Sequence, residues 1–110
     1  MFNLGARMPD ASSVHFIAHF TVNDREGYRK YESGFFPILK AHGGRFITYD
    51  DAPMMLEGDR EGGRTVIIGF DSEEACLAWW NSPEYRELAA FRHASTTTHS
   101  VSIIHSPPSR

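Results

Sequence analysis

Apolar and polar residues alternate along residues 14–22, with the period of two that is typical of a β-strand. Three further stretches rich in β-branched and aromatic residues predict strands at 45–50, 64–70 and 96–105. The run at 64–70 is apolar almost throughout, which predicts a central strand buried on both faces. A bend after the second strand precedes a short predicted continuation at 54–57.

A spacing of three and four residues between large apolar side chains predicts a helix between the first two strands. Asn23 and Glu26 have the spacing of a capping box, so we expect Asn23 to cap this helix, which runs to about His42. Pro37 removes one backbone hydrogen bond and predicts a kink or a local break. The two glycines after His42 supply the backbone freedom that a helix end needs. The predicted buried stripe consists of Tyr28, Tyr31, Phe35, Ile38 or Leu39, and His42.

A second helical region follows the third strand and is opened by another pair with capping-box spacing, Asp71 and Glu74. Ser82 and Pro83 restart the helix, with serine as the cap and proline at the first helical position, and this segment runs to about Arg92. The residues predicted to face inward are Ala75, Leu77 or Ala78, and Trp79 in the first segment and Tyr85, Leu88, Ala89 and Arg92 in the second.

The resulting order, β-α-β-β-α-β, is the split βαβ pattern of α+β ferredoxin-like folds, with a four-stranded antiparallel sheet and the helices on one face. The first and third strands would lie at the centre. The opposite face would stay bare although it carries apolar residues such as Ile17, so we expect two copies to pair through it as a homodimer. We expect residues 14–105 to form one domain, residues 1–13 a flexible N-terminal arm and residues 106–110 a C-terminal tail.

Composition narrows the range of functions. The chain of 110 residues has a net charge of -3 and a pI near 6.0, so it offers no electrostatic attraction to nucleic acid or to an anionic membrane. No apolar run is long enough to cross a bilayer, and no phosphate-binding or dinucleotide-binding glycine motif is present. Cys76 is the single cysteine, which excludes an intrachain disulfide and favours a cytoplasmic location.

Several segments, in order along residues 14–104, resemble the domain-of-unknown-function family 1330. They are IAHFTV at 17–22 followed by Tyr28 and Tyr31, HGGRFI at 42–47, LEG at 56–58, RTVIIGFDS at 64–72, and SPEY at 82–85 followed by Arg92. The resemblance implies a homodimeric α/β barrel in which two sheets close face to face. Similar dimeric barrels include cofactor-free monooxygenases, lactone isomerases and haem-handling proteins, so the resemblance implies a small, partly apolar ligand.

The corner after the first helix combines a titratable ring with a cation. We expect His42 to serve as the catalytic acid or base and Arg45 to be the catalytic residue that binds an anion, in a pocket between sheet and helices. The predicted substrate-binding residues of that pocket are Tyr28, Tyr31, Trp80 and Arg92. The structural alternative is that His42 complements the helix C-terminus and that Arg45 pairs with a carboxylate such as Glu57.

Six histidines raise the question of a metal site. His15 and His19 share a strand face but lie about 13 Å apart, so a site would need His99 or a second subunit, and we expect no metal and no other cofactor. The predicted function is the binding or transformation of a small, partly apolar anionic molecule. The alternatives are a non-catalytic dimer that binds a ligand or a partner, and a haem-handling protein that uses His19 or His42.

Overall fold

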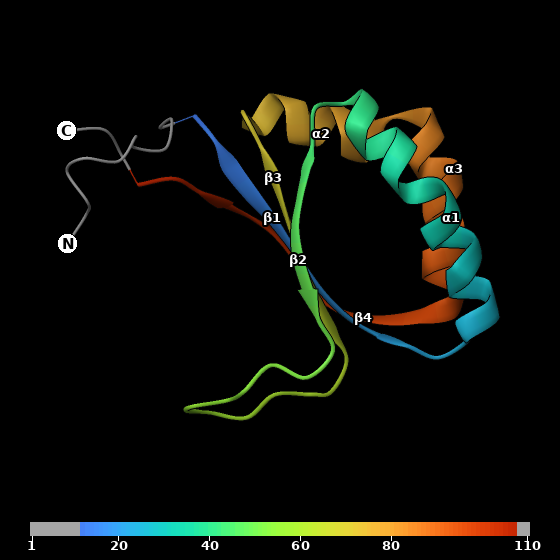
Figure 1. Ribbon diagram of the computed structural model, residues 1–110, viewed down its shortest axis with the longest axis vertical. Coiled ribbons are helices and arrows are strands. Elements are labelled where there is room, and N and C mark those ends of the chain that lie inside the picture. Colours follow the sequence, from blue (N-terminus) through green and yellow to red (C-terminus); the bar gives the residue numbers. More distant parts are fainter. Residues whose placement is uncertain (1–11, 108–110) are drawn as a thin grey trace.

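The structure, a computed structural model, describes residues 12–107 of the chain (Figure 1). Its elements are β1 (Val14–Val22), α1 (Arg25–Ala41), β2 (Arg45–Asp50), β3 (Arg64–Phe70), α2 (Glu73–Asn81), α3 (Pro83–Ser95) and β4 (Thr96–His105). This is the predicted order, including the predicted restart of the second helical region at Ser82 and Pro83, and the α+β ferredoxin-like fold is confirmed. Apart from residues 12–13 and 106–107, the predicted arm at 1–13 and tail at 106–110 lie outside the described residues.

The four strands form one antiparallel sheet in the order β2-β3-β1-β4, so β1 and β3 lie at the centre as predicted. All three helices lie on one side of the sheet, which we call the helix face, and the outer face has no helix over it (Figure 1). The register aligns Ile17 with Ile67 on one side and with Ser102 on the other, which places these three residues on the outer face.

The core lies between the helix face and the helices. The alternate residues of β1 that point into it, Val14, Phe16, Ala18 and Phe20, are all buried, as the period of two predicts. Trp79 of α2 lies at the centre of the core and is fully buried. Its ring centroid is 5.0 Å from that of Phe16 and 4.3 Å from that of Tyr85, so this one side chain joins the sheet to α3.

Two of the predicted helix caps are wrong by one residue. Asp24, and not Asn23, caps α1, because its carboxylate accepts from the backbone N–H of Glu26 at 3.1 Å. Asn23 instead donates its side-chain amide to Thr97, and its backbone N–H to the carbonyl of Ser95, so it ties the end of β1 to the start of β4.

Ser72, and not Asp71, caps α2 by accepting from the backbone N–H of Ala75 at 3.0 Å. The Asp71 carboxylate is directed instead to Arg45 of β2. The cap predicted at Ser82 is confirmed, and Pro83 follows it as the first residue of α3.

Helix α1 continues through Pro37 to Ala41 as one helix, and Gly43 follows with a φ of 76°. The predicted strand continuation at 54–57 is wrong, because these residues belong to the long β2–β3 loop. A strand needs a neighbour to accept its hydrogen bonds, and β3 begins only at Arg64, after Gly63 has turned the chain with a φ of 110°. Met54 and Leu56 consequently lie exposed in that loop.

Candidate functional site

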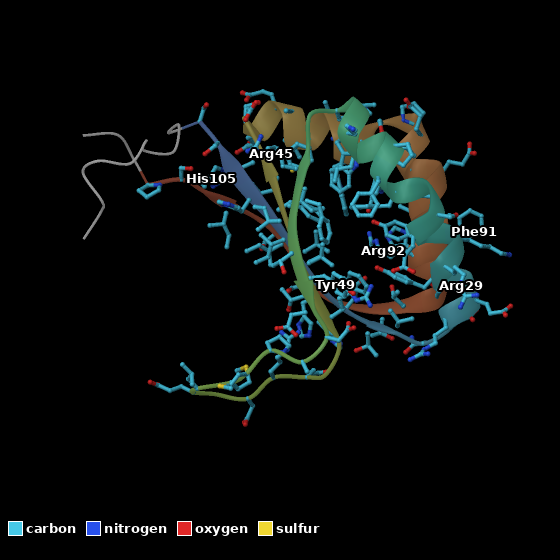
Figure 2. The ribbon with its side chains drawn as sticks, viewed as in Figure 1. Arg29, Arg45, Tyr49, Phe91, Arg92 and His105 are labelled. Atoms are coloured by element: carbon cyan, nitrogen blue, oxygen red, sulfur yellow. The ribbon has the colours of Figure 1, made fainter. Side chains whose placement is uncertain are left out.

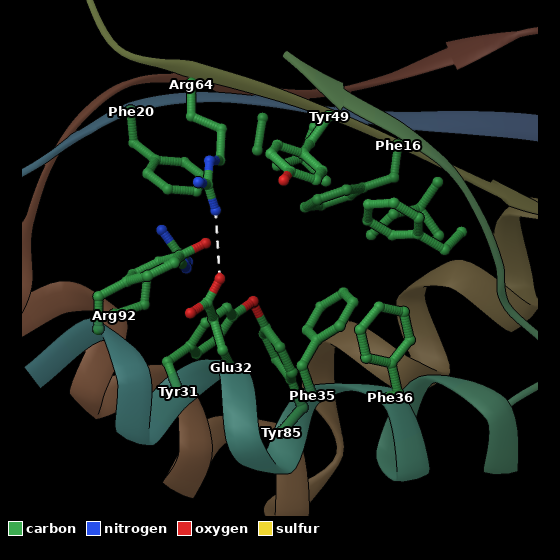
Figure 3. Close-up of a pocket in the computed structure, with 15 residues that line it drawn as sticks. Phe16, Phe20, Tyr31, Glu32, Phe35, Phe36, Tyr49, Arg64, Tyr85 and Arg92 are labelled. Atoms are coloured by element: carbon green, nitrogen blue, oxygen red, sulfur yellow. Dashed lines mark hydrogen bonds and ion pairs between the residues drawn. The ribbon is translucent and has the colours of Figure 1, made fainter. Parts of the chain in front are cut away.

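A cavity of about 160 Å³ lies between the helix face of the sheet and helices α1 and α3 (Figure 3). Nine of its 15 lining residues are aromatic, three are aliphatic, and the remaining three are charged: Glu32, Arg64 and Arg92. The wall is therefore mostly apolar, with two cations and one anion set into it. Such a combination of apolar surface and a few placed polar groups is typical of small-molecule sites.

Strand β2 contributes two rings to the wall, Phe46 and Tyr49. Three residues apart in a regular strand, they would point to opposite faces of the sheet. The register of β2 against β3 shifts between Phe46 and Thr48, so that Phe46 aligns with Ile68 and Tyr49 with Val66, both on the helix face. This irregularity places both rings in the cavity.

Arg92 of α3 is the buried cation of the site, with 3% of its surface exposed. Its guanidinium donates to the Thr98 hydroxyl at 3.4 Å and to Nε2 of His93 at 3.2 Å, and it lies 5.9 Å from the centre of the Tyr31 ring. Among residues 12–107, no carboxylate lies within 4.0 Å of it. Arg92 is thus a buried charge without a counter-charge, and it points into the cavity (Figure 3).

Arg64, the first residue of β3, is the second cation, and it is fully paired. Its Nε and Nη2 donate to the two carboxylate oxygens of Asp51 at 2.7 Å and 3.1 Å, and its Nη1 donates to Glu32 at 3.3 Å. The hydrogen bond from Arg64 holds the pKa of Asp51 below its ordinary value and, in return, raises the pKa of Arg64. Its guanidinium also lies 4.4 Å from the centre of the Tyr49 ring.

The phenols of Tyr28 and Tyr31 are hydrogen-bond donors at neutral pH. The hydroxyls of Tyr31 and Tyr85 lie 2.8 Å apart and share a hydrogen bond. Burial raises the pKa of Tyr31 well above its ordinary value, and burial also raises the pKa of Tyr28. Both phenols therefore keep their protons, and Glu32 is the one carboxylate among the residues that line the cavity.

A second, polar hollow of about 420 Å³ adjoins the cavity and shares Tyr28, Glu32 and Arg64 with it. Arg25 and Arg29 of α1 line this polar hollow, and Figure 2 shows Arg29 at the outer side of the helix. The Glu32–Arg64 ion pair, drawn as a dashed line in Figure 3, therefore lies in the part of the wall that the cavity and the polar hollow share.

Three of the six predicted site residues line the cavity together: Tyr28, Tyr31 and Arg92. Trp80 does not line it, but its ring lies 5.8 Å from the Arg92 guanidinium and 5.5 Å from the Phe16 ring. It therefore supports the wall from behind.

The structure does not bring His42 and Arg45 into the cavity. His42 follows the last residue of α1, where its Nδ1 donates to the carbonyl of Ile38 at 2.9 Å, as the structural alternative predicts. Arg45 lies on the outer face beside Gly69 and pairs with Asp71 at 2.8 Å, and not with Glu57 (Figure 2). The catalytic roles expected for His42 and Arg45 stay predictions.

Sequence reasoning missed Glu32 and Arg64, although a signal for each is present. Arg64 has the same parity along β3 as Val66 and Ile68, which are buried on the helix face. Glu32 lies four residues after Tyr28 on α1, one helical turn along the buried stripe. Both positions therefore belong to faces that the sequence already predicts to be inward.

The histidines lie outside the cavity. On the outer face, the ring centroids of His19 and His99 lie 4.5 Å apart. His99 is therefore the cross-strand neighbour of His19, as the sequence allows. Among residues 12–107, no group of three or more His, Cys, Asp or Glu side chains is placed to hold a metal ion. Nor does that part of the chain contain a helix long and apolar enough to cross a membrane.

The family described as domain of unknown function DUF1330 matches residues 13–106 of the chain. No curated protein matches it. Similar solved structures include the protein of unknown function RPA0582 from Rhodopseudomonas palustris, with 18% identity, a TM-score of 0.69, and coverage of 92% of this chain and 85% of that one.

Two further similar structures carry names that indicate chemistry. SnoaB from Streptomyces nogalater, a cofactor-independent oxygenase, has 19% identity and a TM-score of 0.58 over 90% of this chain and 97% of its own. A conserved protein from Bacteroides thetaiotaomicron described as a possible oxidoreductase has 12% identity and a TM-score of 0.61, covering 88% of this chain and 100% of its own. At these identities the likeness shows the fold alone.

Proposed function

The chain belongs to the DUF1330 family, and we propose that it binds a small, partly apolar anion, for which an aromatic carboxylate is the simplest form, in the cavity under α1. The observation that carries this proposal is Arg92, buried among aromatic rings with no carboxylate in ion-pair distance within residues 12–107. A buried charge without a partner costs free energy, and a bound anion offsets that cost.

The shape and chemistry of the wall support the same ligand. Apolar cavities of roughly 150 Å³ hold a benzene molecule, so a volume of about 160 Å³ suits a single ring. A guanidinium presents its donors in a planar fork that matches a carboxylate, and the Tyr28 hydroxyl adds another donor. The apolar end of the cavity would hold the ring, at Phe36 (Figure 3) and at Phe46, whose ring centroid lies 5.4 Å from that of Phe36.

We propose binding, and not acid–base catalysis, as the primary function. The wall offers one carboxylate, Glu32, which is already engaged by Arg64, and Tyr28 and Tyr31 keep their protons. The haem-handling alternative finds less support, since no histidine lines the cavity and its volume is below that of sites for drug-sized ligands. A small ligand bound without a metal or a nucleotide remains the function that these residues support best.

A ligand-binding assay tests the proposal directly. Benzoate should raise the melting temperature of the wild-type protein in a concentration-dependent way and give a saturable calorimetric titration. Arg92→Gln should weaken benzoate binding by at least about tenfold, in line with the loss of a charged hydrogen bond. Arg45→Gln, which removes the same charge from the outer face, should leave the affinity unchanged.

Arg92→Lys is the control for a folding defect, because it keeps the positive charge. It should retain part of the affinity for benzoate, since it loses only the planar fork of the guanidinium. Circular dichroism of all three variants establishes that each is folded. The proposal fails if benzoate and other small aromatic carboxylates do not bind the wild type, or if folded Arg92→Gln binds them as well as the wild type does.

We propose in addition that two copies of the chain pair through the outer face as a homodimer. Support comes from Ile47 and Ile104, which are large, about half exposed and located on the side of the sheet that no helix covers. Light scattering at micromolar concentration should give twice the chain mass. Ile47→Asp or Ile104→Asp should return a folded monomer, whereas Leu77→Asp, at an exposed site on α2, should not. A wild-type monomer would refute the pairing.

A cytoplasmic location accords with the thiol chemistry of the chain. Cys76 is a free thiol that is buried in the core, and burial raises its pKa to about 11. Fractionation of the producing cells tests this location.

A further inference from the structure

Glu32 occupies a position that the binding of one anion does not require. It lies on α1, lines both the cavity and the polar hollow, and leaves about half of its side chain exposed. Its carboxylate accepts from Nη1 of Arg64 at 3.3 Å (Figure 3). A negative charge in the wall of an anion site weakens the binding of an anion, so the presence of Glu32 there calls for a separate explanation.

Glu32 is not needed to neutralise Arg64. Asp51 already takes two of the hydrogen bonds of this guanidinium, at 2.7 Å and 3.1 Å, both shorter than the contact with Glu32. The Asp51–Arg64 pair has the two-point geometry that is strong and specific for arginine and carboxylate. Removing the charge of Glu32 would therefore leave Arg64 paired and its side chain held in place.

The charges of the site gather around one phenol. Burial raises the pKa of Tyr28, the positive charges of Arg64 and Arg92 oppose that rise, and the negative charge of Glu32 adds to it, so all three charges act on its hydroxyl. Figure 3 shows the same grouping, with Arg92, Arg64 and Glu32 at one end of the cavity and Phe36 at the other. Since Asp51 compensates Arg64, the charges left to act on a ligand are the positive Arg92 and the negative Glu32.

We infer that Glu32 determines the charge of the ligand, so that the site accepts an aromatic monoanion and rejects a dianion of the same shape. The inference rests on the proposed binding function and adds the substrate class to it. The first negative charge of a ligand is balanced by Arg92. Among the described residues that line the cavity, a second charge at the same end finds no further unpaired cation and meets the Glu32 carboxylate, in a cavity whose apolar walls screen charges poorly.

A matched pair of ligands tests the inference. The compounds 2-carbamoylbenzoate and phthalate have nearly the same shape, but the first carries one negative charge and the second carries two at neutral pH. Calorimetry should give at least a tenfold preference of the wild type for 2-carbamoylbenzoate. In Glu32→Gln the affinity for phthalate should rise at least tenfold, and the preference should shrink or reverse. Glu57→Gln removes the same charge from the exposed β2–β3 loop and should leave both affinities unchanged.

The outcomes separate this inference from the binding proposal. If neither 2-carbamoylbenzoate nor benzoate binds the wild type, the binding function itself is wrong. If both bind in an Arg92-dependent way but folded Glu32→Gln keeps the wild-type preference between the paired ligands, binding stands and the role of Glu32 is refuted. A change of preference in Glu57→Gln as large as in Glu32→Gln would also refute it, because the effect would then depend on net charge alone.

Discussion

The arginines on the two sides of the sheet differ in burial and in pairing. On the outer face, Arg45 leaves 55% of its side chain exposed and pairs with Asp71 at 2.8 Å. On the helix face, Arg92 is buried, and within residues 12–107 no carboxylate pairs with it. An exposed ion pair is solvated and contributes little to stability. An unpaired buried cation destabilises the folded protein, and a bound anion offsets that destabilisation. Burial and pairing, and not the presence of an arginine in a family motif, distinguish the candidate binding residue.

The apolar residues of the two faces differ as well. On the helix face, aromatic rings pack against one another around Trp79, and the cavity is a gap in that packing. On the outer face, aliphatic side chains such as Ile47 and Ile104 have no helix over them. The helix face therefore holds the core of one chain together, and the outer face is suited to association.

The largest expected effect is on core stability. Phe70→Ala, at a fully buried position, should lower the free energy of unfolding by about 3–5 kcal/mol. Ile47→Ala on the outer face should cost less than about 1 kcal/mol at the lowest concentration that tryptophan fluorescence allows, where pairing contributes least. Urea unfolding of the two variants measures the difference. Equal losses would mean that the outer face is as well packed as the core.

Tyr31→Phe should have the next largest effect. It removes one partner of the buried Tyr31–Tyr85 hydrogen bond and should cost about 1–2 kcal/mol, because the Tyr85 hydroxyl is left without its partner. The folded protein holds the Tyr31 proton more tightly than the unfolded chain does, so wild-type stability should fall as pH rises above about 10, and should fall less in the variant. Tyr49→Phe, at an exposed ring of the same cavity, should change stability by less than about 0.5 kcal/mol.

The fold could be predicted from the sequence because its signals are local and agree with one another. The period of two in β1 and the apolar run of β3 gave strand bounds that match the structure, and Ser82-Pro83 marked the start of α3. The two cap errors arose because neighbouring polar residues, Asn23 beside Asp24 and Asp71 beside Ser72, compete for the same position. Tertiary contacts with Ser95 and with Arg45 decide that competition, and local spacing does not contain them.

The candidate site was less predictable. Adjacent residues at the start of β2 point to opposite faces of the sheet. The register shift in that strand determines that the rings of Phe46 and Tyr49 both lie on the helix face. A sequence pattern does not show such a shift. Within residues 12–107, Arg92 is buried without a carboxylate partner while Arg64 is paired with Asp51. This difference depends on where loop residue Asp51 lies relative to β3, which only the tertiary structure gives.

A smaller effect is expected at the rim of the helix face. Asp51→Asn should cost about 0.5 kcal/mol at pH 7, because the ion pair with Arg64 is largely exposed on the carboxylate side. The folded pKa of Asp51 is depressed below its ordinary value of 3.8, so its contribution is present above that pH and is lost as pH falls through the folded pKa. Unfolding free energies of wild type and variant, measured from pH 7 to pH 2, should therefore converge at the acid end. Asp59→Asn, in the same loop, is the control.

The smallest effect belongs to the pair on the outer face. A double-mutant cycle of Arg45→Ala and Asp71→Asn should give a coupling energy below about 0.5 kcal/mol, since 55% of the arginine side chain and 86% of the aspartate side chain are exposed. Raising the ionic strength from about 0.01 M to 1 M should remove most of that coupling, because the screening length falls to about 3 Å. A coupling above about 1 kcal/mol that persists in salt would show that water does not reach this pair in solution. The contrast between Arg45 and Arg92 would then disappear, and burial could no longer be used to choose between them.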